Sequence, residues 1–353
     1  MYFNDLIFVF LLIIYFYYQN KFLIYIANKR RLINLSDDNF TKPQAFHEKS
    51  THRLGGIIIF LSLSLVFAYL LFFKNIFIFE IVSFCTLFFI LGLIDDLKIE
   101  VKPKFRLFLM IAFLLALLIH SEFKIERISL DYLNHLMKID IFALFFITLC
   151  FLFIINGANL IDGFNGLLGI HSLIILSILF YINLTNENYN LAYALFFICL
   201  IIFFFIKFNF PTAQIFLGDS GAYTIGTLVA VTTIMTNNLN PSISSFFFCI
   251  LLFYLFFEVF FSFFRKTFFV RQNPLLPDSN HLHMLVYKFL LKKSNEKLKS
   301  NYMVTVYINS LYILLIIPGL FFMTNGLFCR IYFLFLLFFY IYFYKVLYHK
   351  QKL

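Results

Sequence analysis

The sequence predicts an all-α polytopic membrane protein with about eleven membrane-spanning helices, an external N-terminus and a cytoplasmic C-terminus. Of its 353 residues, 62% are hydrophobic and 13% are charged, whereas a soluble domain is about half apolar and about a quarter charged. The apolar residues gather in runs of the length that a bilayer requires, which is about 20 residues for a helix. Lysine and arginine are unevenly distributed between the intervening loops, and this asymmetry predicts the orientation.

Each predicted span is an apolar run bounded by polar or basic residues. The first run is followed by basic residues without a small-residue cleavage site, so we expect a retained helix rather than a signal peptide. The fourth run is the shortest and is expected to be tilted or partly covered by its neighbours. No internal repeat or linker divides the chain, so residues 1–353 are expected to form a single integral-membrane domain. The predicted spans are 6–26, 55–73, 76–94, 105–120, 139–156, 166–183, 191–208, 219–236, 243–264, 302–323 and 327–348.

The loop charges give the predicted orientation. With the N-terminus outside, 22 Lys and Arg residues fall on the inner side and 5 on the outer side, as the positive-inside rule requires. The net charge of +10 is then explained by loops that face anionic lipid, and no nucleic-acid partner is expected. The five cysteines lie within apolar runs and form no C-x-x-C pair, so neither disulfides nor thiolate metal sites are expected.

Five polar motifs fall on the inner face under this topology. The outer loops carry only interspersed acidic and basic residues, as a solvated surface does. One shared site at the cytoplasmic surface of the membrane explains this concentration better than five independent turns. The motifs lie at residues 47–56, 95–96, 156–166, 216–221 and 281–283.

The central motif is Asn156-Gly-Ala-Asn-Leu-Ile-Asp-Gly-Phe-Asn-Gly166. Such a cluster of Asn, Asp and Gly is incompatible with a lipid-facing position, because unpaired polar groups cost several kcal/mol in hydrocarbon. Asn159 and Asp162 are three residues apart, so one helical turn places both side chains on one face. Their oxygens suit a hard cation such as Mg²⁺, although a reverse turn with a helix cap has the same composition.

A pair of acids ends the third apolar run. Adjacent carboxylates such as Asp95 and Asp96 repel each other, so the pair requires a cation or a proton nearby; a polar helix end is the plain structural alternative. The basic residues that follow suit phosphate recognition, while the positive-inside bias explains each of them singly. They are Lys98, Lys102, Lys104 and Arg106.

The remaining motifs carry one or two candidate residues each. Asp219 stands between glycines directly before a predicted helix, where it can bind a metal or cap the helix. Arg53 precedes two glycines that open another helix. His281 and His283 lie on one side only if their segment is extended, and they are candidates for metal or phosphate binding, with solvated loop histidines as the alternative. Glu258 lies inside an apolar run, either as a functional acid or in a structural pair.

In this order the motifs resemble those of the polyprenyl-phosphate N-acetylhexosamine-1-phosphate transferases, the MraY/WecA superfamily. The resemblance extends over residues 47–283, and it implies ten or eleven helices with the active site on the cytoplasmic side. The matching segments are His47…Arg53-Leu-Gly-Gly56, Gly92-Leu-Ile-Asp-Asp96, Asn156-x-x-Asn-Leu-Ile-Asp-Gly-x-Asn-Gly166, Phe216-Leu-Gly-Asp-Ser-Gly221 and Pro277-Asp-x-x-His-Leu-His283.

The resemblance implies that a polyprenyl phosphate in the membrane attacks the β-phosphate of a UDP-amino sugar and releases UMP. It implies Mg²⁺ as cofactor, with Mn²⁺ as an alternative, bound by Asp219 and Asn159, and it allows a homodimer. Catalytic roles are implied for Asp95, Asp96 and Asp162, and the role of Asp95 is open between deprotonating and orienting the lipid phosphate. The residues expected to bind substrate are His47, Lys49, Arg53, Asn156, Asn165, Arg271, His281 and His283.

The chain departs from the family pattern at two motif positions. Asn165 replaces an Asp of many bacterial members, which excludes a base there, and Met284 removes one imidazole of the histidine motif. The loop 265–301 lacks the triple-histidine ending of the peptidoglycan enzymes, which favours a WecA-like enzyme for a surface polysaccharide in a bacterial inner membrane. The alternatives are a phospho-MurNAc-pentapeptide transferase and a multispan transporter, although transport sites usually lie near the midplane.

Overall fold

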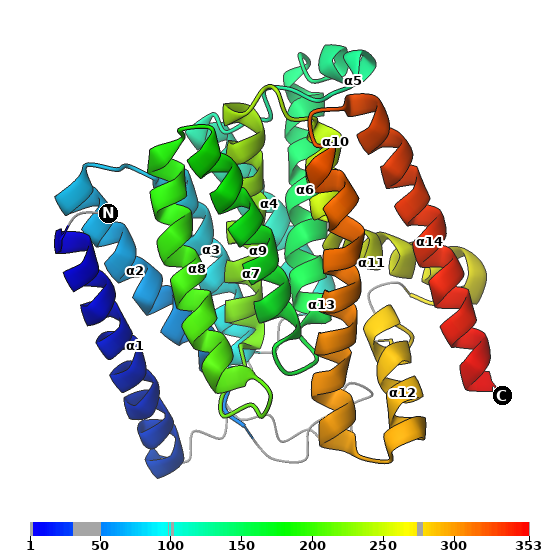
Figure 1. The fold of residues 1–353 in the computed structure, drawn as a ribbon, viewed down its shortest axis with the longest axis horizontal. Coiled ribbons are helices and arrows are strands. Elements are labelled where there is room, and N and C mark those ends of the chain that lie inside the picture. Colours follow the sequence, from blue (N-terminus) through cyan, green and yellow to red (C-terminus); the bar gives the residue numbers. More distant parts are fainter. Residues whose placement is uncertain (1–2, 31–50, 98, 100–101, 274–277, 353) are drawn as a thin grey trace.

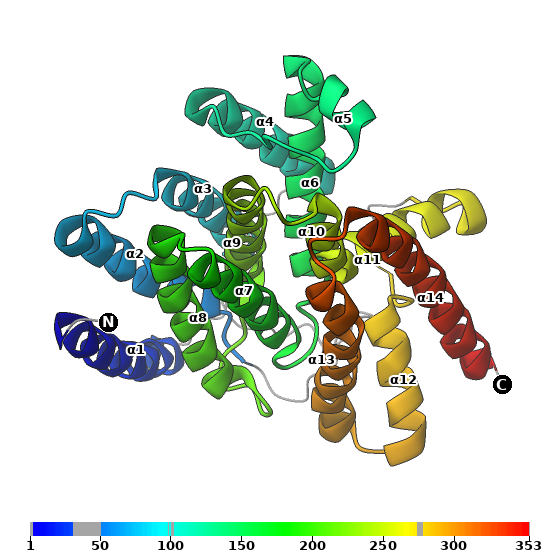
Figure 2. The same ribbon diagram turned by 45° about the horizontal axis from the view of Figure 1, so that its top comes forward.

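The computed structural model describes residues 3–30, 51–97, 99, 102–273 and 278–352. In this part of the chain the regular structure is helical, and most helices run side by side in one bundle (Figures 1 and 2). The helices are α1 (Phe3–Arg30), α2 (Gly55–Lys74), α3 (Phe79–Asp96), α4 (Pro103–Ser121), α5 (Asp131–Leu136), α6 (Asp140–Ile161), α7 (Leu167–Thr185), α8 (Tyr189–Asn209), α9 (Gly218–Leu239), α10 (Ser245–Leu251), α11 (Phe253–Phe264), the π-helix η2 (Arg265–Val270), α12 (Leu282–Ser294), α13 (Lys297–Phe321) and α14 (Gly326–Lys352).

The prediction of a multi-span helical membrane protein is confirmed, but the count of eleven spans is not. Among the described residues, eight helices are long and apolar enough to cross a membrane, or nine if the bent pair of α10 and α11 forms one span. The predicted spans 76–94 and 219–236 correspond to α3 and α9, which are not among these helices. The helix α3 is apolar enough but carries three acidic residues, Glu80, Asp95 and Asp96, whereas Gly, Thr and Asn lower the hydropathy of α9.

The helix α9 lies at the centre of the bundle, where α2, α3, α6 and α7 pack around it (Figure 2). Every residue from Ser220 to Ile234 is buried. Its small residues allow close helix contact, since a Cβ added at Gly226 would lie 2.9 Å from the Ala158 Cβ of α6. Because protein rather than lipid surrounds α9, the sequence of this helix need not be uniformly apolar.

The C-terminal part of the chain differs from the prediction in two places. The predicted span 243–264 is broken at Leu252, and its two halves, α10 and α11, meet at 72°. The predicted loop 265–301 contains η2 and the helix α12, and Asn295 caps the end of α12 in the left-handed conformation. The five cysteines are free, as expected.

A buried carboxylate fastens α1 to its neighbours. Asp5 accepts hydrogen bonds from the Tyr69 hydroxyl at 2.6 Å and from the Tyr193 hydroxyl at 2.5 Å, and its Oδ1 lies 2.5 Å from Lys74 Nζ. The cluster joins the start of α1 to the end of α2 and to the start of α8. Since α2 begins at Gly55, a helix of 20 residues, about 30 Å long, separates this cluster from the opposite end of the bundle.

The polar motifs gather at one end of the bundle, the lower end in Figure 1. There α2 begins, α3 and α6 end, α9 begins and α12 lies, whereas α5 lies at the other end. The fold therefore brings together segments separated by more than 100 positions in the chain.

Candidate active site

The first element of the site is a carboxylate that caps a helix. Asp96, which ends α3 and is 1% exposed, accepts the backbone N–H of Asp219 at 2.8 Å and that of Ser220 at 2.9 Å. The Ser220 hydroxyl donates to the same carboxylate at 2.5 Å. Free N–H groups and the helix dipole make the start of a helix favourable for a negative charge. Asp96 therefore fixes the start of α9, and with it the position of Asp219.

Glycines of three motifs permit this contact. A Cβ on Gly92 of α3 would lie 2.4 Å from Ser220 Cα, and one on Gly56 of α2 would lie 2.1 Å from Ser220 Oγ. Gly218 has a φ of +76°, and a Cβ there would also meet the Asp96 carboxylate at 2.7 Å. Only glycine satisfies both demands at that position. The glycines of the motifs thus serve the packing of α2 and α3 against the start of α9.

Arg53 is held beside the same carboxylates by a short stretch of paired backbone. The backbone N–H of Phe216 donates to His52 at 2.9 Å, and the N–H of Gly55 donates back to Phe216 at 2.9 Å. Arg53 Nη1 then lies 3.7 Å from Asp219 and 3.8 Å from Asp96. Its side chain remains 27% exposed, so it is accessible to a ligand as well as to the two acids.

The end of α6 brings the central motif to Asp219. The Asn159 amide donates to Asp219 Oδ1 at 2.5 Å, and Asp162 follows the last residue of α6. Burial and the nearby charge of Asp219 raise the pKa of Asp162 well above that of a free carboxyl, while Arg53 acts in the opposite direction. A neighbouring cation would favour the ionised form of Asp162.

Asp95 faces a different partner from Asp96. Its Oδ2 accepts a hydrogen bond from Arg106 Nη1 at 3.1 Å, so the pair joins the end of α3 to the start of α4. Tyr223, one turn along α9 from Asp219, is fully buried beside this ion pair. Its hydroxyl faces the Asp95 carboxylate, so it helps to hold that acid in place.

Among the residues that the structure describes, the formal charges of this cluster do not cancel. Four carboxylates, those of Asp95, Asp96, Asp162 and Asp219, face two guanidinium groups, those of Arg53 and Arg106. An excess of negative charge in a half-buried site favours the binding of a cation. We refer below to these six residues together with Asn159 as the acidic cluster.

The donor set fits Mg²⁺ with a small number of protein ligands. Within the described ranges, no three His, Cys, Asp or Glu side chains converge closely enough to hold a metal ion alone. Mg²⁺ commonly keeps several water molecules and takes one or two carboxylates together with substrate phosphates. Rotating the Asn159 amide by half a turn would place its oxygen beside Asp219 Oδ1. Asp219 and Asn159 would then present two oxygens side by side.

A second group of polar residues surrounds the start of α12. His281 precedes the helix in extended conformation and His283 is its second residue, so both imidazoles lie on one side, with ring centroids 5.5 Å apart and planes 4° from parallel. His281 Nδ1 lies 3.1 Å from Glu258 Oε1, and the Tyr254 hydroxyl lies 3.2 Å from His283 Nδ1. We call these two histidines the imidazole pair.

The central motif connects the imidazole pair to the acidic cluster. The Phe164 ring meets His283 edge-on at 5.8 Å and contacts Tyr287, one turn further along α12, at 5.4 Å. Phe164 lies two positions after Asp162 in the same loop. The loop between α6 and α7 is therefore flanked by Asp219 on one side and by α12 on the other.

Other residues expected from the sequence lie outside these two groups. The Asn156 amide donates to the Leu152 carbonyl within α6, and Arg271 is exposed after η2. Asn165 is buried; its amide donates to Pro211, and its backbone N–H donates to Asn301 at 3.0 Å. The contacts of Asn165 hold the loop between α6 and α7 in place. Substrate binding by Asn156, Arg271 and Asn165 stays a prediction. His47, Lys49 and Lys98 lie outside the described residues.

Several residues of the site were not singled out from the sequence. Ser220 binds Asp96, Tyr223 lies beside Asp95, and Tyr340 donates to Glu258 at 2.6 Å. Ser and Tyr inside apolar or Gly-rich helices are common, so their residue type alone gives no signal. Of these three residues, only Tyr223 has an informative spacing in the sequence, because it stands one helical turn after Asp219.

Comparison with known proteins gives a consistent result. The model for glycosyl transferase family 4 matches residues 78–237, which include the acids of α3, the central motif and the start of α9. The chain is 35% identical over 202 residues to a phospho-N-acetylmuramoyl-pentapeptide-transferase of Dictyoglomus turgidum, covering 55% of this chain and 62% of that protein. It is 28% identical over 239 residues to an undecaprenyl-phosphate alpha-N-acetylglucosaminyl 1-phosphate transferase of Thermotoga maritima, covering 67% of this chain and 68% of that protein.

The match to the Dictyoglomus turgidum protein spans less than two thirds of its length. The residues that match the family model include every member of the acidic cluster except Arg53. These findings support the resemblance to the MraY/WecA superfamily, and the chain is similar to members of glycosyl transferase family 4 over residues 78–237.

Proposed function

We propose that the chain transfers an N-acetylhexosamine 1-phosphate from a UDP-sugar to a polyprenyl phosphate, giving a polyprenyl-diphospho-sugar and UMP. The observation that supports this most strongly is the environment of Asp219. It contacts Asn159 and Arg53 at the start of a buried helix, where an excess of negative charge lies next to basic side chains. Two anionic substrates require such an arrangement of cation, carboxylate and guanidinium.

The contacts of each site residue lead to the role that we propose for it. When bound between Asp219 and Asn159, Mg²⁺ would neutralise charge on the donor diphosphate. Arg53 is within ion-pair distance of Asp219 and is partly exposed, so it would bind a phosphate oxygen of the donor. Asp95 would accept or orient the proton of the lipid phosphate, with Arg106 holding the carboxylate in place. The imidazole pair would contact the donor diphosphate from the side of α12.

The proposal includes a location. The motif loops share one end of the bundle (Figure 1), and the excess of basic residues on that side favours the cytoplasmic face of a bacterial inner membrane. There a soluble UDP-sugar and a membrane lipid reach the same site. We further propose that residues 1–353 act as one membrane domain in the first membrane step of a surface glycan.

The donor has two candidates. A simple UDP-N-acetylhexosamine is favoured by the likeness to the Thermotoga maritima protein and by the histidine motif, which has two imidazoles and then Met284. A UDP-MurNAc-pentapeptide is favoured by the likeness to the Dictyoglomus turgidum protein. The substrate assay must therefore include both.

The decisive test is transfer by purified full-length protein in detergent. Undecaprenyl phosphate and Mg²⁺ are incubated with radiolabelled UDP-GlcNAc, UDP-GalNAc or UDP-MurNAc-pentapeptide, followed by extraction into butanol. Butanol-soluble label with equimolar UMP from one donor supports the proposal and names the sugar. Absence of label with every donor, for protein that is folded and monodisperse, contradicts it and favours the transporter alternative.

A further inference from the structure

Glu258 is a buried acid in α11 at the point where three helices meet. It is 1% exposed, and its carboxylate receives three hydrogen bonds. The backbone N–H of Leu282 and His281 Nδ1 bind Oε1 at 3.0 and 3.1 Å, and the Tyr340 hydroxyl of α14 donates to Oε2 at 2.6 Å. A buried charge is tolerated only with such partners, and one of them belongs to the imidazole pair.

We propose that Glu258 is a positioning residue which, through His281, orients the imidazole pair toward the diphosphate of the nucleotide-sugar donor. Tyr340 donates a hydrogen bond to the Glu258 carboxylate and so helps to position it. The inference rests on the proposed function and adds to it the residues that control donor binding.

The contacts of Glu258 fix both the ring and the helix that carry the donor-binding groups. Because Nδ1 of His281 is used by the carboxylate, the other ring nitrogen is left to face a ligand, as in histidines whose orientation is set by a neighbouring acid. Glu258 also caps α12 by binding the N–H of Leu282, the first residue of that helix. Loss of the carboxylate would release the ring and the helix start together.

His283 supplies the second half of the pair. His283 Nε2 is buried with no hydrogen-bond partner among the described residues, and it carries the ring proton when the Tyr254 hydroxyl donates to Nδ1. A buried donor without a partner is unusual in a native structure. The parallel ring of His281 lies beside it, so an anionic oxygen is a suitable acceptor for both edges.

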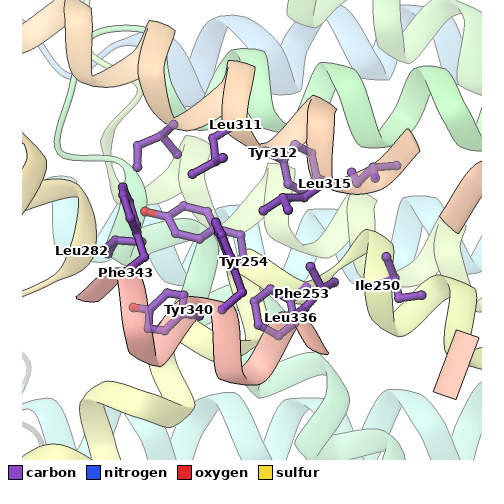
Figure 3. Close-up of a pocket in the computed structure, with 13 residues that line it drawn as sticks. Ile250, Phe253, Tyr254, Leu282, Leu311, Tyr312, Leu315, Leu336, Tyr340 and Phe343 are labelled. Atoms are coloured by element: carbon purple, nitrogen blue, oxygen red, sulfur yellow. The ribbon is translucent and has the colours of Figure 1, made fainter. Parts of the chain in front are cut away.

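The surroundings strengthen these hydrogen bonds. An apolar pocket lies between α11, α13 and α14, and Tyr254, Leu282 and Tyr340 are among its lining residues (Figure 3). Figure 3 shows the hydroxyl groups of Tyr254 and Tyr340 turned toward the same side of the pocket, the side on which Leu282 lies. Apolar surroundings make hydrogen bonds to a carboxylate stronger and their loss more costly.

The test compares kinetic constants of purified variants of the full chain, measured separately for donor and lipid. Glu258→Gln should raise the donor KM by about tenfold, the lower end of the range for residues that orient metal-binding histidines, and leave the lipid KM within about twofold of wild type. Tyr340→Phe keeps the carboxylate and should raise the donor KM by about threefold, the loss of one hydrogen bond. Tyr332→Phe on the same helix, whose hydroxyl donates to the Leu315 carbonyl at 2.9 Å, should match wild type.

A double-mutant cycle separates positioning from general stability. The amide oxygen of Gln can still accept the Leu282 N–H, so if Glu258 acts through His281, adding Glu258→Gln to His281→Asn should leave the donor KM of the single His281 variant unchanged. An unchanged donor KM in Glu258→Gln, equal rises for donor and lipid, or full additivity with His281→Asn each overturns the inference. If Glu258→Gln does not fold, the donor KM of Tyr340→Phe against Tyr332→Phe decides the question.

Failure of the proposed function would be visible in the wild type alone. If no donor in the panel yields product, calorimetric binding of UDP-N-acetylglucosamine and of UDP-MurNAc-pentapeptide to wild type and to Tyr340→Phe replaces the kinetic assay. A weaker affinity of the variant for either nucleotide supports the inference although transfer fails. Equal affinities, or no binding to the wild type, overturn it.

Discussion

Ser220 donates both its backbone N–H and its hydroxyl to one oxygen of Asp96, at 2.9 and 2.5 Å. The acid that ends α3 thus closes the start of α9, and the neighbouring Asp219 is presented toward Asn159. Asp95, one position earlier, faces Arg106 instead. The two adjacent acids therefore have separate partners, as expected of residues about 100° apart on a helix.

The first prediction concerns Asp96 as a cap. Asp96→Asn should place amide hydrogens against the N–H groups of α9, because one oxygen of the carboxylate becomes NH₂. We expect a loss of stability of about 1–3 kcal/mol, the cost of unsatisfied buried donors, and a fall in transfer activity of about 100-fold. Ser220→Ala removes one hydroxyl only and should cost about 1 kcal/mol. Thermal unfolding in detergent together with transfer assays measures both, and wild-type behaviour of Asp96→Asn would contradict the capping role.

The second prediction concerns the proposed metal ligands. Asp219→Ala and Asn159→Ala should each abolish transfer at saturating Mg²⁺ while folded protein is retained, because each removes an oxygen ligand. Asn238→Ala is the matched control; Asn238 lies at the opposite end of α9 and binds the Lys124 carbonyl at 2.9 Å. Near wild-type turnover of either site variant would show that the assignment of metal ligands is wrong.

The third prediction is a pH dependence for Asp95→Asn. The second ionisation of a phosphate monoester lies near pH 6, so the dianionic lipid nucleophile becomes abundant as pH rises above that value. If Asp95 takes the lipid proton, Asp95→Asn should lower kcat most at about pH 5.5 and recover partly above about pH 7. A kcat profile over this range checks it, with Asp96→Asn as the comparison that should show no such recovery. Parallel profiles for the two variants would remove the proton-accepting role from Asp95.

The fourth prediction concerns the anchor of α1. Asp5→Ala leaves Lys74 without its buried carboxylate and should destabilise the protein by about 3 kcal/mol, the lower end for breaking a buried ion pair. Tyr69→Phe should cost about 1 kcal/mol, since one hydrogen bond is lost. Transfer activity per folded molecule should be unchanged in both, because α2 separates this cluster from the motif loops. A specific loss of turnover without loss of stability would point to an unexpected role of the anchor.

The fifth prediction concerns orientation. In a variant without native cysteines, Lys293→Cys on α12 should resist a membrane-impermeant thiol reagent in intact cells and react in inverted vesicles. Tyr132→Cys on α5 is the counterpart, since it is 75% exposed at the opposite end of the bundle (Figure 1). It should show the reverse pattern. Labelling of Lys293→Cys in intact cells would show that the protein has the opposite orientation to the one proposed.

Much of the fold was accessible from the sequence, because the length and polarity of an apolar run are local properties. Ten of the eleven predicted spans each correspond to one continuous helix, and the eleventh, 243–264, corresponds to the bent pair of α10 and α11. The helix α12 was not predicted because its 13 residues are too few to span a membrane and lie within a basic loop. The bend at Leu252 was missed because the apolar run continues through it without Gly or Pro.

The sequence by itself determined which residue types gather at one membrane face, because charge bias and motif order can be read along the chain. Only the tertiary structure decided how these residues are paired. Asp96 and Ser220 are separated by 124 positions, and Glu258 and Tyr340 by 82. Nothing in the local pattern distinguishes a carboxylate that caps a distant helix from one that faces a substrate. The distinction depends on the close packing of glycine-bearing helices, which sets the N–H groups that each buried acid can reach.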